Sequence, residues 1–385
     1  MAIPLAYNLR NLVVRKTTTL MTALGIALTV AVLLSILALV NGLRVTLETS
    51  SDPLHVIVLR KGAESELTSI FQRPQYQDLK FKPGIATGRD GQPMVSLEVI
   101  TVISMANVDS NNANVTLRGL MPSGIEMRHV RMASGTWFKP GLRQLVAGKS
   151  IVDRYPDAAL GKKIHFGRGD WQIVGVFDAG RGAQDSEIWG DVNEMAADLN
   201  RPDFLSSATI QGADAVAAQA LVNDLNNDQK LELHAESEKE YYDQQTSQAV
   251  PIEYTGIFVA LVMAVGSAFA AMNTMYATVS RRAREIGTLR VLGFSRFSIL
   301  TSFFVEAVLL SALGGLLGCL LVLPLNGLTT AVGNSNFAEL AFDFRVTPRI
   351  MMVGILFAAA LGSAGGLFPA FSAARKEILT ALREV

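Results

Sequence analysis

The chain of 385 residues is half hydrophobic and only 18% charged, and its 34 basic and 34 acidic residues give a formal net charge of zero. This balance excludes the diffuse basic excess that favours nucleic-acid binding, so we expect no nucleic acid among its partners. The apolar residues are concentrated in a few long stretches, which indicates a membrane protein.

Four of these stretches predict membrane-spanning helices. The predicted spans are residues 17–43, 251–280, 298–323 and 350–374. Each is long enough to cross a hydrocarbon core of about 30 Å as a helix. They lack the alternation of a barrel strand, and in lipid only a helix or a closed barrel satisfies its own backbone hydrogen bonds.

Basic residues predict which segments are cytoplasmic. They gather in residues 1–16, in the link at residues 281–297 and in the tail at residues 375–385. By the positive-inside rule these segments and both termini face the cytoplasm. Residues 44–250 and the loop at residues 324–349 are then exported, which predicts a multi-pass inner-membrane protein with a periplasmic or extracellular domain.

The first span is predicted to remain as an uncleaved anchor. It is about twice as long as the apolar region of a signal peptide, and residues 44–48 offer no clear small-x-small cleavage site. The only cysteine, Cys319, lies in the third span. We therefore expect an exported domain without disulfides, held together by its own core.

The exported segment is predicted to be a mixed α+β domain. Runs of β-branched and apolar residues between Gly, Pro, Asn and Asp clusters predict strands at residues 55–59, 95–100, 114–117, 144–146, 163–166 and 171–177. Residues 213–226 are predicted to be helical, because their apolar side chains share one face.

The polar residues 231–248 lead through Pro251 into the second span. We expect a helix that extends this span outward as a stalk, bent or broken near Pro251. A solvated linker with a short helix is the alternative. A stalk would make the exported domain and the membrane helices move together.

The sequence contains no recognisable catalytic or metal-binding motif. The four histidines, His55, His129, His165 and His234, have no second ligand at metal spacing. Neither a Gly-x-Ser-x-Gly nor a His-Glu-x-x-His motif occurs. We therefore expect no catalytic, metal or cofactor site in this chain.

The arginine-rich link contains a predicted amphipathic helix. Ala283, Ile286, Leu289 and Gly293 fall on one face, and arginines surround the remainder. A lone basic amphipathic helix is usually an interfacial anchor for anionic headgroups, which is one interpretation.

The residues in and around this helix resemble a known family. Residues 279–293 (VSRRAREIGTLRVLG), followed by FVEA at 304–307 and LGGLLG at 313–318, closely resemble the signature of the FtsX/MacB-type ABC permease family. Residues 9–27 and 366–383 are similar to the two ends of that family. GTWF at 135–138 and QLVAG at 144–148 resemble the MacB-type periplasmic core.

The resemblance implies a permease subunit that recruits a cytoplasmic ABC ATPase, works as a homo- or heterodimer and transmits ATP-driven movement to the exported domain. ATP and Mg would be bound by the partner ATPase, because no nucleotide-binding domain is expected in this chain. The permease itself would not be an enzyme. A periplasmic adaptor is a further partner consistent with the family, beside the lipid membrane.

The resemblance further implies a function in the export or extraction of an apolar or amphipathic substrate by mechanotransmission. Two alternatives remain open. One is an FtsX-like signalling regulator of a cell-wall hydrolase, and the other is a membrane-anchored binding protein without ATPase coupling.

The resemblance also assigns an ATPase-coupling role to the amphipathic helix. Ile286 and Leu289 would supply an apolar anchor, Glu285 and the arginines would fix register, and Gly287 and Gly293 would permit close approach and a turn. The predicted coupling residues are Arg281, Arg282, Arg284, Glu285, Ile286, Gly287, Leu289, Arg290 and Gly293.

Small residues and one carboxylate stand out within the spans. Two pairs of glycines, Gly314 with Gly318 and Gly362 with Gly366, are each predicted to share a helix face that packs against another helix or across a dimer. Glu306 lies roughly 12 Å into its span.

A carboxylate at that depth should face protein, so we expect a hydrogen bond or ion pair with the region of Arg290 or Arg296. Proton coupling and snorkelling are the alternatives for Glu306.

Overall fold

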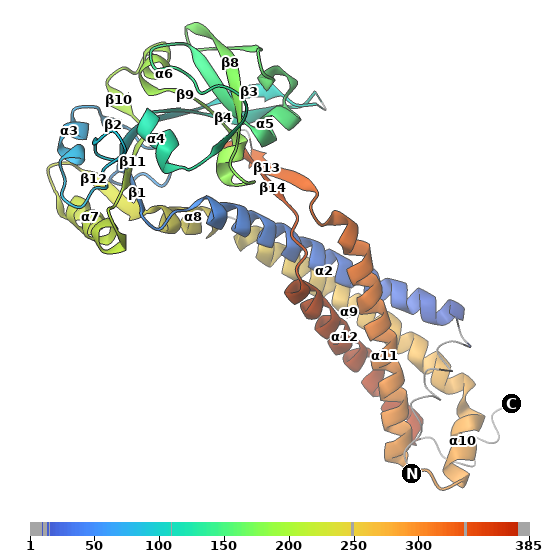
Figure 1. Ribbon diagram of the computed structural model, residues 1–385. Helices are drawn as coiled ribbons and strands as arrows, with labels where there is room; N and C mark the ends of the chain where they lie inside the picture. The colour runs from blue at the N-terminus through green and yellow to red at the C-terminus, as the bar shows by residue number, and fades with distance from the viewer. Residues whose placement is uncertain are drawn as a thin grey trace. The chain divides into compact units, whose positions relative to one another are not determined.

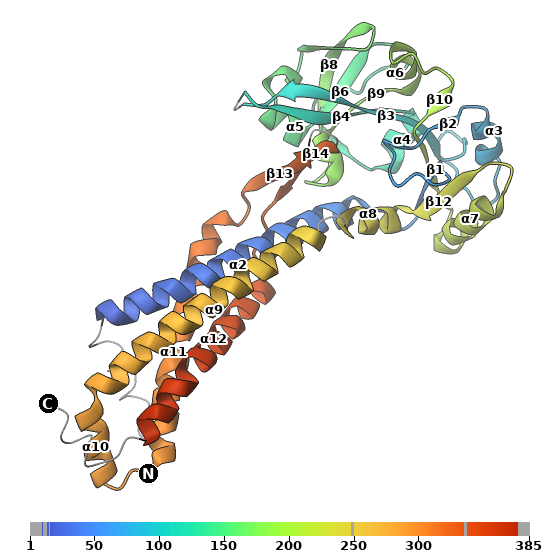
Figure 2. The same ribbon diagram turned by 180° about the vertical axis from the view of Figure 1, so that it is seen from behind.

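The computed structural model describes residues 10, 14, 16–108, 110–247, 250–334 and 337–375, which form a helical unit and a mixed unit (Figures 1 and 2). The helical unit comprises described residues of Met1–Gly42, Ala249–Leu328 and Phe344–Val385, and the mixed unit those of Leu43–Gln248 and Thr329–Asp343. Most of the predicted N-terminal segment and of the predicted tail lies outside the described residues.

The helical unit is built from four long helices and one short one. Its elements are α2 (Lys16–Ser50), whose last turns belong to the mixed unit, α9 (Val250–Arg281), α10 (Ala283–Val291), α11 (Arg296–Val322), the 3-10 turn η3 (Leu323–Leu325) and α12 (Pro348–Arg375). The long helices α2, α9, α11 and α12 run alongside one another and are apolar and long enough to cross a membrane.

Polar side chains join α2 to α9 within the helical unit. The hydroxyl oxygens of Thr29 and Ser267 are 2.5 Å apart, and the Thr22 hydroxyl lies 3.4 Å from that of Thr274. Ser267 also donates to the carbonyl oxygen of Gly25. Such hydrogen bonds between helices hold a bundle together where lipid gives no hydrophobic drive.

The mixed unit is centred on a ten-stranded sheet. In the described residues the strand order is β12-β1-β11-β3-β4-β9-β6-β8-β5, with β7 paired to β8. The bounds are β1 (His55–Arg60), β3 (Val95–Ala106), β4 (Asn112–Leu120), β5 (Arg131–Gly135), β6 (Gln144–Gly148), β7 (Lys163–Phe166), β8 (Gly169–Asp178), β9 (Glu187–Asp191), β11 (Ser207–Gln211) and β12 (Leu233–Ser237). Most neighbours are antiparallel, but β4 pairs with β9 and β6 with β8 in parallel.

Short helices and two small sheets complete the mixed unit. They are β2 (Phe71–Gln72), α3 (Gln75–Lys80), α4 (Pro122–Met127), α5 (Lys149–Arg154), η1 (Pro156–Ala158), η2 (Ala183–Ser186), α6 (Val192–Asp198), β10 (Phe204–Leu205), α7 (Ala215–Asn227), α8 (Glu238–Ser247), β13 (Thr329–Asn334) and β14 (Phe337–Asp343). One core lies between α7 and the β1 end of the sheet, and another contains Trp171 and the β4, β6, β8 and β9 side chains.

The fold class predicted from the sequence is confirmed. A mixed domain is inserted between the first and second long apolar helices, and all six predicted strands and the predicted helix at α7 are present. The strands β5, β9, β11 and β12 were not predicted. β9 and β11 are short and buried, so they lack the alternation that would distinguish them from a helix.

The prediction of a helix over residues 231–248 is wrong in its first part. Residues Leu233–Ser237 form β12, which pairs antiparallel with β1 and places Leu233 and Ala235 in the core. The polar residues after it form α8, as predicted. The junction between α8 and α9 at residues 248 and 249 lies outside the described residues.

Side-chain contacts from several positions attach α8 to the rest of the mixed unit. Glu238, the first residue of α8, lies 2.8 Å from the Nδ1 atom of His55 on β1 and accepts a hydrogen bond from the backbone N–H of Asp52. Gln244 donates to Glu236 on β12. Tyr241 is buried against Ile57 and Leu59 of β1. The helix that we predicted as a stalk is therefore bound to the mixed domain along its length.

The segment predicted as an exported loop at residues 324–349 contains the hairpin β13–β14. Glu339 accepts a hydrogen bond from the Tyr155 hydroxyl and pairs with Arg154 at 3.0 Å, and Asp343 pairs with Arg181 at 2.5 Å. The backbone N–H of Ala341 donates to Ser186. The chain between α11 and α12 is therefore fastened to the mixed domain by specific polar contacts.

A buried ionic network joins β3, β4 and β9. The Arg118 guanidinium donates to Glu66 at 2.9 Å, to Glu187 at 2.8 Å and also to Glu98. Glu98 pairs in turn with Arg128 at 2.8 Å. Burial raises the pKa of the Glu98 carboxyl, but the Arg128 and Arg118 charges outweigh burial and lower this pKa to about 2.

Removal of the Glu98 charge is expected to make the domain less sensitive to acid. The folded-state pKa of Glu98 is depressed, so its charge stabilises the fold fully above about pH 4.5, and this contribution is lost as pH falls toward 2. We expect Glu98→Gln to lower the unfolding temperature strongly at pH 7 and less at pH 3. Glu126→Gln, at the domain surface, is the control, and an equal loss at both pH values would contradict the prediction.

Candidate functional site

The candidate site is the short helix α10 between α9 and α11. Arg282 leaves helical geometry (φ −104°, ψ 16°), so α9 ends there and α10 begins at Ala283. Gly293 has a φ of +92°, which only glycine adopts readily, and it turns the chain after α10. The Ser295 side chain then caps α11 by accepting from the N–H of Ser298.

The inward face of α10 packs on its own bundle. Ile286 is 1% exposed and lies in a core cluster with Val279, Phe303 and Ala373, and Ala283 and Gly287 are also buried. Leu289 is half-buried. The expectation that Ile286 anchors a partner protein is therefore corrected. Its apolar face is already buried, because α10 packs against α9, α11 and α12.

The outward face carries charges and exposed apolar side chains. Arg284, Glu285 and Thr288 are exposed along it, and so is Arg281 at the end of α9. Val291 and Leu292 at the end of α10 are 64% and 66% exposed, and Phe297 in the first turn of α11 is 72% exposed. The sequence analysis missed these three residues, because they fall outside the helical apolar stripe. Three large apolar side chains exposed next to charges are typical of a protein-binding surface.

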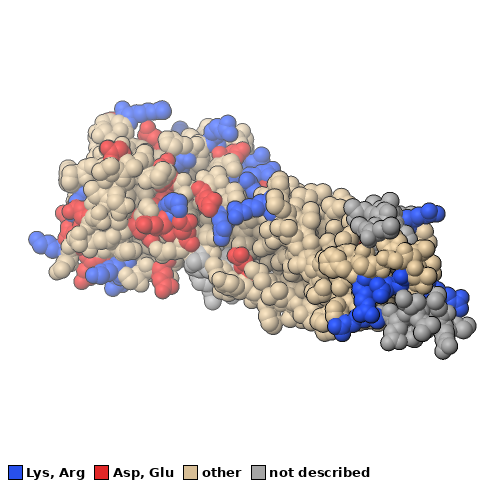
Figure 3. Space-filling view, turned by 90° about the horizontal axis from the view of Figure 1, so that it is seen from below, with Lys and Arg blue, Asp and Glu red and all other residues tan. Residues whose placement is uncertain are grey.

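Lys and Arg side chains gather at one end of the helical unit, beyond a long stretch without charge (Figure 3). Of the predicted coupling residues, Arg290 donates to the carbonyl oxygen of Phe294 and is half-buried, so it stabilises the turn after α10. Arg281 and Arg284 are exposed on the surface.

Glu306 pairs with Arg282 and not with the region of Arg290 or Arg296. A guanidinium nitrogen of Arg282 lies 2.9 Å from Glu306, and the Arg282 Nε lies 2.8 Å from Glu285. Arg282 and Glu306 are both buried. The expected ion pair exists, but its partner is the residue where α9 ends, because that break turns the Arg282 side chain into the bundle.

The four predicted packing glycines lie at helix contacts inside the unit. A Cβ atom at Gly314 would meet the Cβ of Ile26 at 2.8 Å, and one at Gly318 would meet the Cβ of Val30 at 2.8 Å. A Cβ atom at Gly362 would overlap the side chain of Ser311, and one at Gly366 would overlap the side chain of Ala307, both on α11. These glycines thus allow α11 to approach α2 and α12 to approach α11.

Comparison with protein families agrees with this architecture. Residues 19–228 match the MacB-like periplasmic core domain, and residues 257–378 match the FtsX-like permease C-terminal domain. The chain belongs to the FtsX/MacB-type ABC permease family. It is therefore a multi-pass membrane permease component of an ABC transporter, and its mixed unit is a periplasmic-type domain.

Individual relatives differ in how much of the permease they share. The macrolide export ATP-binding/permease protein MacB of Pasteurella multocida is 27% identical over 71% of this chain, and the match covers 44% of that protein. The uncharacterized ABC transporter permease YknZ of Bacillus subtilis is 23% identical over 97% of both chains. The permease spans about half the length of several MacB relatives that it matches.

Two solved structures are similar to part of the permease. The periplasmic region of MacB from Actinobacillus actinomycetemcomitans matches 52% of the permease with 11% identity and a TM-score of 0.38. The extracellular domain of the noncanonic ABC-type transporter YknZ from Gram-positive bacteria matches 48% of the permease with 16% identity and a TM-score of 0.36.

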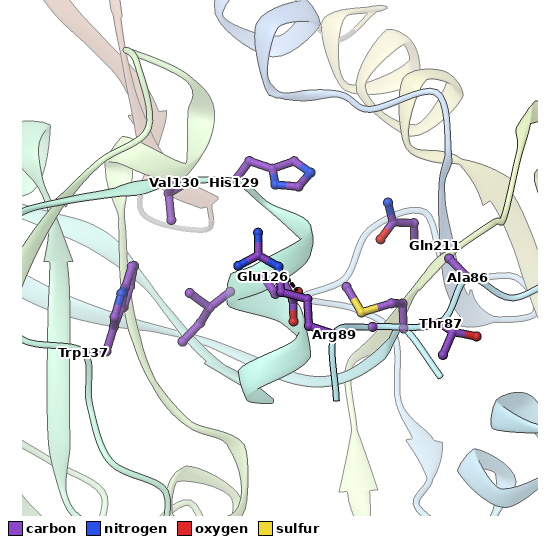
Figure 4. Close-up of a pocket in the computed structure, with 11 residues that line it drawn as sticks. Ala86, Thr87, Arg89, Glu126, His129, Val130, Trp137 and Gln211 are labelled. Carbon is purple, nitrogen blue, oxygen red and sulfur yellow. Dashed lines mark ion pairs between the residues drawn. The ribbon is translucent and has the colours of Figure 1, made fainter. Parts of the chain in front are cut away.

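The periplasmic domain of the permease also contains a pocket of about 430 Å³ (Figure 4). Trp137 and Val130 lie on one side, and Thr87 and Gln211 lie on the other. The ion pair of Arg89 with Glu126, at 3.5 Å, lies between them. An apolar wall next to an exposed ion pair, whose charged groups can contact a ligand instead of each other, suits a ligand with an apolar body and a polar end. In the described residues no group of three His, Cys, Asp or Glu side chains could hold a metal ion.

Proposed function

We propose that the permease couples ATP hydrolysis by a separate cytoplasmic ATPase to movement of its periplasmic domain, and so drives export or extraction of an apolar or amphipathic substrate. The observation that carries this proposal is the exposed surface of α10 and of the turn into α11. Val291 and Leu292 at the end of α10 and Phe297 at the start of α11 are exposed there, and Arg284 and Glu285 are exposed on α10. A groove on the ATPase would bury the apolar residues, and the charges would fix their register.

The basic residues support an orientation with α10 in the cytoplasm of an inner-membrane protein. Five arginines lie in or next to α10, at positions 281, 282, 284, 290 and 296, and the positive-inside rule places such a segment on the cytoplasmic side. The permease is then the non-enzymatic subunit, the ATPase binds ATP and Mg, and both termini are cytoplasmic. A second permease subunit and a periplasmic adaptor complete the proposed assembly.

Two chain segments support transmission of movement to the periplasmic domain. The helix α8, which follows the domain and precedes α9, is fixed to β1 through His55 and Glu238. The end of α2 is fixed to η2, because Ser50 accepts from the N–H of Ala183 at 2.6 Å and its carbonyl accepts from Gln184. Displacement of either helix would therefore act on the domain. The pocket beside Trp137 is where we place contact with the substrate.

The substitutions Leu292→Asp and Phe297→Asp are each expected to weaken binding of the ATPase. A buried apolar anchor is worth about 2 kcal/mol or more, so the Kd of the ATPase that copurifies with the native permease should rise about thirtyfold or more. Binding and permease-stimulated hydrolysis are measured together with purified proteins.

Val216→Asp is the matched control, because Val216 is also an exposed apolar residue but lies on α7 of the periplasmic domain. If Leu292→Asp and Phe297→Asp bind and stimulate the ATPase like wild type, α10 is only an interfacial anchor and the proposed coupling is wrong.

A further inference from the structure

Arg282 occupies the break between the second span and the docking helix. Its backbone is not helical, so the chain changes direction at this residue, between Arg281 of α9 and Ala283 of α10. The side chain is buried, although arginine is rarely fully buried in proteins unless it is paired. A flexible break at this position would let α10 swing without moving the bundle.

The Arg282 guanidinium connects the surface of α10 to the interior of α11. Its Nε contacts Glu285 at 2.8 Å, and the Glu285 side chain is 57% exposed on the outward face. Another nitrogen contacts Glu306 at 2.9 Å, and the Glu306 side chain is only 6% exposed. The guanidinium also lies over the Phe303 ring, 4.9 Å from its centre.

We propose that Arg282 is a positioning residue that locks α10 to α11, so that displacement of the docked helix moves the bundle. The proposal rests on the proposed function of α10 and adds the residue through which movement of α10 would be transmitted to the other helices of the unit. The buried contact with Glu306 holds the break at one angle. The exposed contact with Glu285 places the same guanidinium beside the surface that the ATPase would bind.

The lock depends on the shape of the arginine side chain. A planar guanidinium presents nitrogens in a fixed fork and reaches two carboxylates at once, whereas a lysine ammonium is a single point charge. The pair with Glu306 is persistent because both of its side chains are buried, and separating opposite charges in the interior is costly. Lysine at position 282 should therefore keep the charge but lose the fixed angle.

The test uses the full permease with its copurified ATPase, ATP and Mg. The variants are Arg282→Lys, Glu306→Gln and the exchanged pair Arg282→Glu with Glu306→Arg. We expect the Kd of the ATPase to stay within about threefold of wild type in all of them, because the outward apolar residues are unchanged. Stimulated ATP hydrolysis should fall about tenfold in the two single variants, within the usual range of coupling between sites. It should recover in part in the exchanged pair, which restores the ion pair between positions 282 and 306 but not the contact with Glu285.

The control is Arg345→Lys, which changes an exposed arginine of the same unit between α11 and α12 and should leave both readouts unchanged. Wild-type stimulation in Arg282→Lys and Glu306→Gln would overturn the lock, even where Leu292→Asp abolishes binding and the proposed function stands. A loss of ATPase binding equal to the loss of stimulation would also overturn it, because Arg282 would then belong to the docking surface.

Folding of the variants decides the remaining cases. If the single variants do not fold but the exchanged pair folds and restores stimulation, the ion pair is the lock. If the exchanged pair folds without restoring stimulation, or if none of the variants folds, Arg282 only stabilises the bundle and the proposal is wrong.

Discussion

Replacement of Arg118 by leucine is expected to unfold the periplasmic domain. Arg118 is buried, and its guanidinium contacts the carboxylates of Glu66, Glu98 and Glu187. Its removal leaves three acidic groups close together in the interior, with Arg128 still paired to Glu98. Loss of one partner of a buried ion pair costs about 3–5 kcal/mol, which is a large share of the stability of a typical domain.

The measurement is thermal unfolding of the full permease in detergent, together with limited proteolysis of the periplasmic domain. Arg89→Leu is the matched control, because the Arg89 side chain is 96% exposed and its pair with Glu126 should contribute less than about 1 kcal/mol. A wild-type unfolding temperature in Arg118→Leu would show that the buried network does not hold the domain.

The double substitution Gly314→Leu and Gly318→Leu is expected to separate α11 from α2 and to prevent correct assembly of the helical unit. Even a single Cβ atom at either position would lie 2.8 Å from a side chain of α2, closer than carbon atoms approach one another. Overpacking in a tight core costs about 1–3 kcal/mol for each site, and two leucines on one face add their effects.

The yield of folded protein, the thermal stability in detergent and the ATPase stimulation are the measurements. Gly266→Leu is the control within a membrane helix, because no atom lies within 4 Å of a Cβ at that position. Normal assembly of the Gly314 and Gly318 double variant would show that α2 and α11 do not need this close approach.

Several parts of the permease followed from local sequence patterns. The long uncharged stretches predicted the membrane helices, because a chain in lipid must satisfy its backbone hydrogen bonds internally and can do so within one helix. The apolar runs between turn residues predicted strands such as β1, β3 and β8, and these are present. In both cases neighbouring residues carry the signal.

Contacts between residues far apart in the sequence could be identified only from the tertiary structure. The polar residues at β12 form a strand because β1 supplies the hydrogen-bonding edge, although local propensity favours a helix. The hairpin β13–β14 is attached through Glu339 to Arg154, which lies far away in the sequence.

The sequence by itself determined that an arginine-rich amphipathic helix links two apolar spans. Only the tertiary structure decided which side chains of this region are buried. The apolar stripe of the helix, with Ile286, is buried by the bundle, whereas Leu292 and Phe297 are exposed. The partner of Glu306 is Arg282 because the helix breaks there and turns the guanidinium inward, and the direction of one side chain at a break depends on the packing of all neighbouring helices.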